Sequence, residues 1–140
     1  MCAATGMASL ADDSGIEVPG LGGWPGPSSA RWMGPEAGDV DRREGLLAEV
    51  ERRCPGDRRA RYVCVVTLAR PATPPLSARG ETTGVLVPPR GSGGFGYDPC
   101  FLSDDLGITF GEATAAAKDG VSHRARALAA LLARLVGEGA

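Results

Sequence analysis

The sequence predicts an α/β fold, and three observations lead to this prediction. Short β-branched and apolar segments alternate along the chain with segments that carry a helical apolar stripe. Apolar residues make up 43% of the 140 residues, which is enough for the core of one domain. Glycine and proline, at 21 and 11 residues, predict many turns between these segments. We therefore expect a single domain over residues 1–140.

An acidic pair precedes the first predicted strand. Asp12 and Asp13 follow two apolar residues, and the alternating segment 16–18 after them predicts a short strand. Because neighbouring residues of a strand point to opposite faces, only one of the two carboxylates can address a given site. A carboxylate at a strand end suits Mg²⁺, and it can equally orient or deprotonate a water. The alternative is a solvated turn or a helix cap.

A loop and a helix come next. Residues 19–38 are rich in glycine and proline and predict a loop. Asp39 or Asp41 can cap a helix that runs to about Arg53, where the following Cys-Pro-Gly ends it. The apolar stripe of this helix consists of Leu46, Leu47 and Val50.

A hairpin and a last helix complete the predicted elements. Residues 62–68 are apolar and β-branched, which predicts a strand buried on both faces. A proline-rich turn at 71–75 leads to a second strand near 77–87. Ser122 is the predicted N-cap of the last helix. The residues expected to face inward from that helix are Leu128, Leu131, Leu132 and Leu135.

Residues 91–99 form a predicted glycine-rich loop, in which the backbone can approach a ligand closely. Phe95 and Tyr97 supply ring faces on which a base can stack, a contact worth about 1–3 kcal/mol. The loop lacks the Gly-Lys-Ser/Thr of a phosphate loop. Pro99 and an apolar segment follow it, whereas a dinucleotide fingerprint needs a helix there. A flexible linker is the alternative.

Lys118 and His123 are the only lysine and the only histidine, whereas the other basic residues are arginines. If Ser122 caps the helix, His123 and Arg124 lie in its first turn, where positive side chains oppose the macrodipole. The free N–H groups of that turn favour an anionic or carbonyl-bearing ligand. The alternative is the start of a surface helix with basic side chains.

Charge and cysteine usage exclude several classes of partner. The net charge of −2 gives no reason to expect a nucleic-acid polymer, and the arginines between Arg42 and Arg61 are interleaved with acidic residues. None of the 4 cysteines belongs to a C-x-x-C pair, so we expect free thiols rather than zinc ligands. We find no signal peptide and no apolar segment of membrane-spanning length, and expect a cytoplasmic protein without membrane contact.

The motifs occur in a fixed order along essentially the whole chain. They are Ala-Asp-Asp-Ser-Gly-Ile (11–16), Leu-Gly-Gly-Trp-Pro-Gly (21–26), Ser-Ala-Arg-Trp (29–32), Gly-Gly-Phe-Gly-Tyr-Asp-Pro (93–99), Lys118 and Ser-His-Arg (122–124). Together they resemble the inosine/xanthosine triphosphate pyrophosphatases, also called XTP/dITP diphosphatases. The resemblance implies hydrolysis of 6-keto purine nucleoside triphosphates (ITP, dITP and XTP) to the monophosphate and pyrophosphate. It also implies Mg²⁺ as cofactor, a homodimer, and a mixed central sheet flanked by helices.

The same resemblance assigns roles to individual residues. Asp13 is expected to be the catalytic acid or base and a magnesium contact. The residues expected to bind substrate are Ser14, Phe95, Gly96, Tyr97, Asp98, Lys118, His123 and Arg124. Among these, Phe95 stacks on the base, Lys118 reaches phosphate, and the His123–Arg124 pair reads the base. Arginine offers only donors and therefore favours the oxygen at position 6 over the amino group of adenine. We expect these groups to converge on one cleft.

The sequence also departs from the family. Its members begin with a strand, a Ser/Thr-x-Asn-x-x-Lys phosphate loop and a long helix with an acidic metal contact, and this chain is expected to lack all three. It contains no asparagine, and its only lysine is Lys118. A free sheet edge is the expected consequence. Two alternatives stay open: a catalytically impaired, truncated nucleotide-binding or dimerising remnant of the family, and an unrelated small α/β interaction domain.

Overall fold

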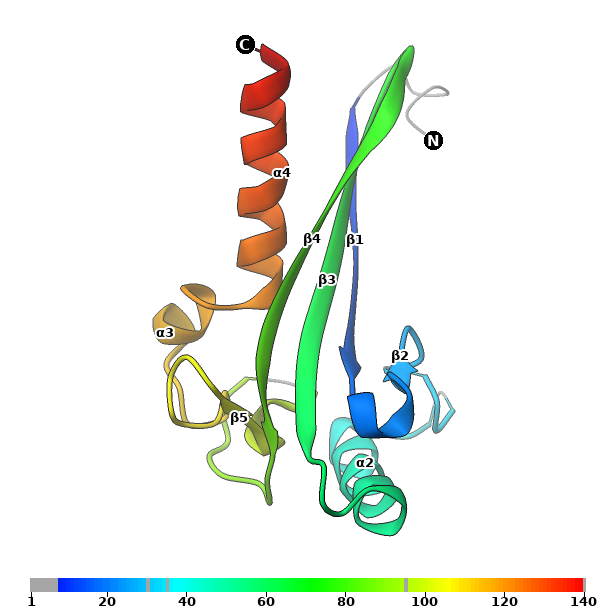
Figure 1. The fold of residues 1–140 in the computed structure, drawn as a ribbon, viewed down its shortest axis with the longest axis vertical. Helices are drawn as coiled ribbons and strands as arrows, with labels where there is room; N and C mark the ends of the chain where they lie inside the picture. The colour runs from blue at the N-terminus through cyan, green and yellow to red at the C-terminus, as the bar shows by residue number, and fades with distance from the viewer. Residues whose placement is uncertain (1–7, 30, 35, 95, 140) are drawn as a thin grey trace.

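The computed structural model describes residues 8–29, 31–34, 36–94 and 96–139 (Figure 1). One sheet has the strand order β2-β1-β3-β4-β5. The strands are β1 (Ser9–Glu17), β2 (Pro25–Gly26), β3 (Arg59–Arg70), β4 (Thr73–Leu86) and β5 (Phe101–Ser103). The helices are α2 (Asp39–Arg53), α3 (Ala115–Asp119) and α4 (His123–Gly139), with short 3-10 turns η1 (Pro19–Leu21) and η2 (Asp98–Cys100). The predicted α/β class is confirmed.

All pairings between the described strands are antiparallel, whereas the resemblance implied a mixed sheet. The hairpin of β3 and β4 is the longest pairing. Its turn is shorter than predicted, because Pro74 and Pro75 lie inside β4. The pairing is irregular between Leu68 and Arg70, opposite these prolines. An irregular stretch tolerates proline because it does not need every backbone donor.

The acidic pair lies inside β1 and not at a strand end, because β1 pairs with β3 along its whole length. This long-range pairing extends the strand well beyond the predicted segment 16–18. The other edge of β1 meets β2 only at Ile16 and Glu17. Among the described strands, the edge of β1 from residue 9 to residue 15 therefore pairs with no other strand.

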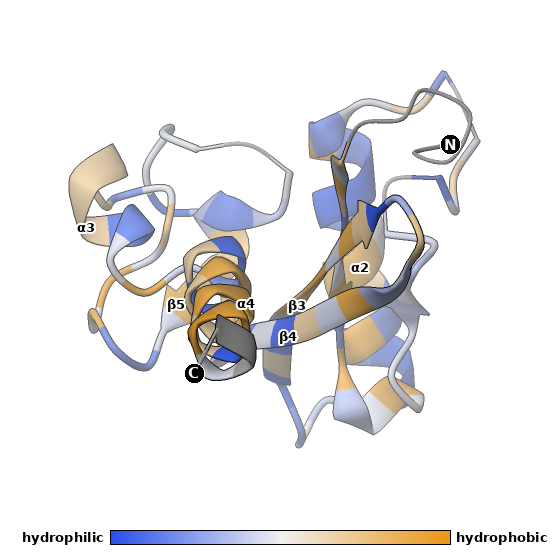
Figure 2. Cartoon of the chain, turned by 90° about the horizontal axis from the view of Figure 1, so that it is seen from above, coloured by the Kyte–Doolittle hydropathy of each residue, from blue (hydrophilic) through white to orange (hydrophobic). Residues whose placement is uncertain are grey.

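Helix α4 packs along one face of β4 and β3, as Figures 1 and 2 show. The predicted cap is confirmed, since the Ser122 hydroxyl accepts a hydrogen bond from the backbone N–H of Ala125 at 3.1 Å. The residues that form the core under α4 are Cys64, Val66, Leu76, Ala78, Ala127 and Leu131. Two burial predictions were wrong. Leu132 is 61% exposed because it lies on the outer side of α4, and Val65 is 38% exposed because α4 covers only one face of β3.

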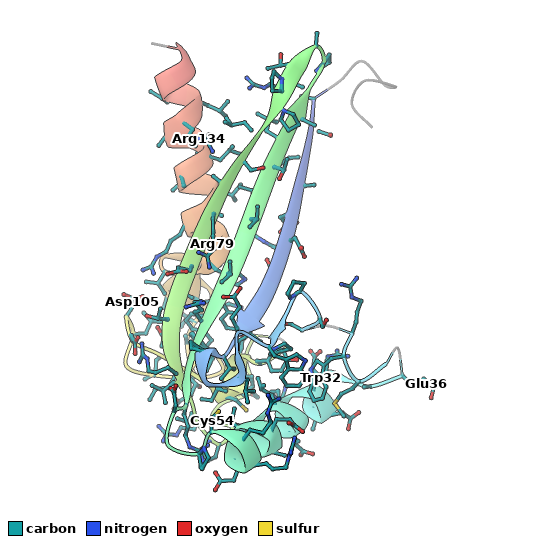
Figure 3. The ribbon with its side chains drawn as sticks, turned by 45° about the vertical axis from the view of Figure 1, so that its right-hand side comes forward. Trp32, Glu36, Cys54, Arg79, Asp105 and Arg134 are labelled. Carbon is teal, nitrogen blue, oxygen red and sulfur yellow. The ribbon has the colours of Figure 1, made fainter. Side chains whose placement is uncertain are left out.

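A second core lies at the other end of the long strands, around α2 (Figure 3). The predicted bounds of α2 are confirmed, and its inward residues Leu46 and Val50 are buried. The N-cap of α2 is Gly38, so neither Asp39 nor Asp41 is the predicted N-cap. The Asp41 carboxylate accepts a hydrogen bond from the backbone N–H of Gly38 at 3.0 Å, as the third residue of a capping box does. Within the described ranges, no helix has both the length and the apolar character needed to cross a membrane.

Candidate active site

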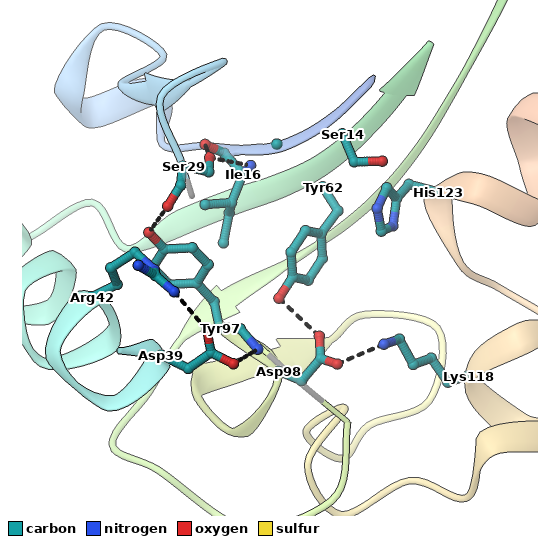
Figure 4. A pocket seen from close by; sticks show the side chains of 12 residues that line it. Ser14, Ile16, Ser29, Asp39, Arg42, Tyr62, Tyr97, Asp98, Lys118 and His123 are labelled. Atoms are coloured by element: carbon teal, nitrogen blue, oxygen red, sulfur yellow. Dashed lines mark hydrogen bonds and ion pairs between the residues drawn. The ribbon is translucent and has the colours of Figure 1, made fainter. Parts of the chain in front are cut away.

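A cavity of about 170 Å³ lies where β1, β3, the loop before η2 and the start of α4 meet (Figure 4). Its lining residues are Ser14, Gly15, Ile16, Ser29, Asp39, Arg42, Tyr62, Gly96, Tyr97, Asp98, Lys118 and His123. Six of the predicted site residues are among them. The structure therefore brings together groups that are up to about a hundred residues apart in the sequence.

Asp98 is the most deeply buried charged group of this cavity, with 2% of the residue exposed. Its carboxylate accepts hydrogen bonds from the Tyr62 hydroxyl at 2.8 Å and from the Lys118 ammonium at 2.5 Å. Burial, followed by the charge of Asp98, raises the pKa of Tyr62 well above its usual value, so this phenol stays protonated as a donor. The Lys118 ammonium, predicted to reach phosphate, lies against Asp98 in this structure.

His123 forms another wall of the cavity. Its ring stacks on Tyr62 with 4.9 Å between ring centroids and an interplanar angle of 14°. Burial lowers its pKa to about 4, and the positive charges of Lys118 and Arg124 add to this effect. The imidazole is therefore neutral at pH 7. Its Nδ1 atom is buried without a hydrogen-bond partner among the described residues, which suits a polar group of a ligand.

Tyr97 anchors the glycine-rich loop. Its hydroxyl donates to the backbone carbonyl of Ser29 at 2.6 Å and accepts from Trp32 Nε1 at 3.0 Å. The Ser29 hydroxyl in turn accepts from the backbone N–H of Ile16 at 2.8 Å, which ties the loop to the end of β1. Phe95, the predicted stacking ring, lies outside the described residues.

Asp13 does not line the main cavity. It belongs to the opposite face of β1 from Ser14, because consecutive residues of a strand alternate between faces. It lines a separate cavity of about 120 Å³ instead. Ser14 and Gly15 line both cavities, and they lie on the free edge of β1. The expected convergence on one cleft is therefore wrong for Asp13, whose cavity adjoins the main one at Ser14 and Gly15.

Arg124 also lies beside the main cavity rather than in it. Its guanidinium forms an ion pair with Asp12 at 2.8 Å. Its side chain lines a neighbouring cavity of about 130 Å³, to which Ser14, Lys118 and His123 also contribute. Each cavity alone is smaller than the roughly 300–1,000 Å³ of common small-molecule sites, but the three adjoin at Ser14.

Several cavity residues were missed by the sequence prediction. Tyr62 could have been suspected, because a tyrosine in a predicted buried strand needs a hydrogen-bond partner for its hydroxyl. Ser29 belongs to the Ser-Ala-Arg-Trp motif (29–32), although the sequence assigned no role to it. No local signal distinguishes Arg42 from the other arginines of its helix. Across the described ranges, no cluster of three or more His, Cys, Asp or Glu residues could hold a metal ion.

The sequence of this chain is similar to those of known proteins. Residues 1–134 match the Ham1 family (Ham1p_like). The chain is 48% identical over 137 residues to the dITP/XTP pyrophosphatase of Halorhodospira halophila, covering 96% of this chain and 69% of that protein. It is 52% identical over 131 residues to the dITP/XTP pyrophosphatase of Deinococcus radiodurans, covering 93% and 64% of the two chains.

Solved structures agree with the sequence matches. The Staphylococcus aureus Ham1 protein superposes with a TM-score of 0.89 at 37% identity, over 96% of this chain and 70% of that one. A Ham1 protein from Coxiella burnetii gives a TM-score of 0.88 at 36% identity, over 95% and 69% of the two chains. The chain thus spans between about half and about two thirds of the length of the relatives it matches.

Proposed function

The chain belongs to the Ham1 family, and from this premise we propose that it hydrolyses 6-keto purine nucleoside triphosphates to the monophosphate and pyrophosphate. One observation carries the proposal. Six residues assigned to substrate binding line one cavity, although they come from separate segments: Ser14, Gly96, Tyr97, Asp98, Lys118 and His123. The family match also argues against an unrelated interaction domain.

The cavity's chemistry supports a keto base. Arg42 lines it and Arg124 lies next to it, and both side chains offer only donors. Such donors favour the oxygen at position 6 of inosine or xanthine and disfavour the amino group of adenine. A mismatch of this kind can discriminate by a factor of about 10⁴. The neutral His123 ring adds one donor and one acceptor to the same wall.

The phosphates are assigned to the free edge of β1. Ser14 and Gly15 line the cavities on both faces, so a nucleotide held in the main cavity would extend past them toward Asp13. Asp13 is exposed and a single carboxylate, which fits Mg²⁺, an ion that combines one or two carboxylates with substrate phosphates and water. Bound there, Mg²⁺ would neutralise phosphate charge. The Asp13 carboxylate would orient or deprotonate the attacking water.

Pyrophosphate release from inosine triphosphate in the presence of Mg²⁺ tests this proposal. We expect turnover by the wild-type chain and loss of at least about a hundredfold in kcat for Asp13→Asn, since general acid–base catalysis contributes about 10²–10⁴. Asp12→Asn is the matched control, because it changes the neighbouring carboxylate on the opposite face, and it should retain kcat. Binding of inosine triphosphate without turnover would support the impaired remnant instead.

The proposal includes a homodimer and a cytoplasmic location. The exposed apolar side chains of Leu132 and Val136 on α4 are the features that support association with a second copy. Sedimentation equilibrium of the purified chain measures this directly, and a monomer at all concentrations would contradict the dimer.

A further inference from the structure

The N-terminal part of α2 contacts both the N–H and the carbonyl group of Gly96. The Asp39 carboxylate accepts a hydrogen bond from the Gly96 N–H at 2.9 Å, and the Arg43 guanidinium donates to the Gly96 carbonyl at 3.2 Å. Gly96 has a φ of +61°, a conformation that disfavours other residues. The helix therefore fixes a backbone position that the chain's local preferences alone would leave open.

Asp39 is itself held in place for this contact. Its second carboxylate oxygen accepts from Arg42 at 2.8 Å, and Arg42 also donates to the carbonyl of Ala37 at 2.7 Å. The hydrogen bond from Gly96, followed by that from Arg42, lowers the pKa of Asp39 below its usual value. The carboxylate is therefore charged at neutral pH, which strengthens both hydrogen bonds.

Helix capping does not explain why an aspartate occupies position 39. The carboxylate of Asp41 performs that task through the N–H of Gly38. Asp39 is 47% exposed at its side chain, so it is not a core residue either. Its charge is directed instead at the loop that leads into Tyr97 and Asp98, two residues of the cavity wall.

We infer that Asp39 is a positioning residue, which holds the Gly96 loop against α2 so that Tyr97 and Asp98 face the cavity. The inference rests on the proposed function for its consequence in catalysis. Because the proposed function assigns this loop to the nucleoside and not to the reacting phosphorus, Asp39 sets the affinity for the nucleotide and leaves the chemical step unchanged. Its loss should therefore raise KM and spare kcat.

Three variants test the inference: Asp39→Ala, Asp39→Asn and the matched control Asp41→Ala. A hydrogen bond to a charged group contributes enough to predict a KM for inosine triphosphate about tenfold higher in Asp39→Ala, with kcat within about twofold. Asp39→Asn keeps an acceptor oxygen and should recover part of the affinity. Asp41→Ala removes a carboxylate from the same helical turn and should leave KM unchanged, although it lowers the melting temperature.

Amide hydrogen exchange of Gly96, followed by NMR, provides a measurement that does not need turnover. We expect exchange about tenfold faster in Asp39→Ala and unchanged in Asp41→Ala. If the wild-type chain does not hydrolyse inosine triphosphate, the proposed function fails, and the exchange rates alone decide whether Asp39 holds the loop. Unchanged Gly96 exchange in Asp39→Ala overturns the inference, and so does an unchanged KM in an active enzyme.

Discussion

Two regions meet at the start of α4 and are stabilised in different ways. Along the helix, α4 is held to β3 and β4 by apolar contacts and by a close approach of backbones at Gly80. Around the cavity, charged and polar side chains from distant segments are matched to one another, as in the group of Tyr62, Asp98 and Lys118. The stability of the first region depends on close packing of apolar side chains. The stability of the second depends on each buried polar group keeping its hydrogen-bond partner.

The largest effect is expected where a buried charge loses its partner. Asp98→Ala removes the acceptor of both Tyr62 and Lys118, and breaking a buried ion pair in this way costs about 3–5 kcal/mol. Urea denaturation at pH 7, extrapolated to water, measures this loss of unfolding free energy. The double variant Asp98→Ala, Lys118→Met should recover part of it, because no uncompensated charge is left. A double variant as unstable as the single one would show that the charge balance does not matter here.

The packed region should respond to added volume instead. A Cβ atom on Gly80 would lie 2.1 Å from the backbone nitrogen of Ala127 and 2.4 Å from the carbonyl oxygen of His123. Because neither backbone atom can move without shifting α4, Gly80→Ala should cost about 3 kcal/mol, measured by the same denaturation. Gly56→Ala is the control, since a Cβ there meets no atom within 4 Å. Equal unfolding free energies for the two variants would mean that α4 does not pack closely against β4 at Gly80.

The two regions also differ in how far the sequence predicts them. The bounds of α2, the cap at Ser122 and the β3–β4 hairpin follow from local apolar periodicity and from capping residues, and the structure confirms them. The outward position of Leu132 was missed because the apolar stripe of α4 is narrower than its leucines suggest. A local pattern cannot show how much of a helix its partner covers.

The sequence alone could not predict which distant residues contact one another. Asp98 and Tyr62 are 36 residues apart, and only the tertiary fold brings them within hydrogen-bond distance. The same holds for the acidic pair, because a register shift of one residue between β1 and β3 would exchange the faces of Asp12 and Asp13. The residue types of the site were predicted from the sequence, whereas their faces and partners depend on the fold.

His123 belongs to both regions, and its titration should link them. Its pKa is about 4 in the folded chain, against 6.5 for the unperturbed side chain. Between these values the unfolded chain binds one more proton at this site, so stability rises with pH across that window and falls as the pH drops from about 6.5 toward about 4. The loss should be on the order of 2 kcal/mol between pH 7 and pH 4.5.

The variant His123→Gln isolates this contribution, because every other titrating group is shared with the wild type. Unfolding free energies of both proteins at several pH values between 4.5 and 7 should converge as the pH falls, since only the wild type has a buried imidazole to protonate. The ring also stacks on Tyr62 next to the Asp98 network, so acid that charges His123 acts on the cavity and on the first turn of α4 together. Parallel pH profiles for the two proteins would show that His123 has the same pKa in the folded and the unfolded chain. In that case protonation of the ring does not couple the two regions.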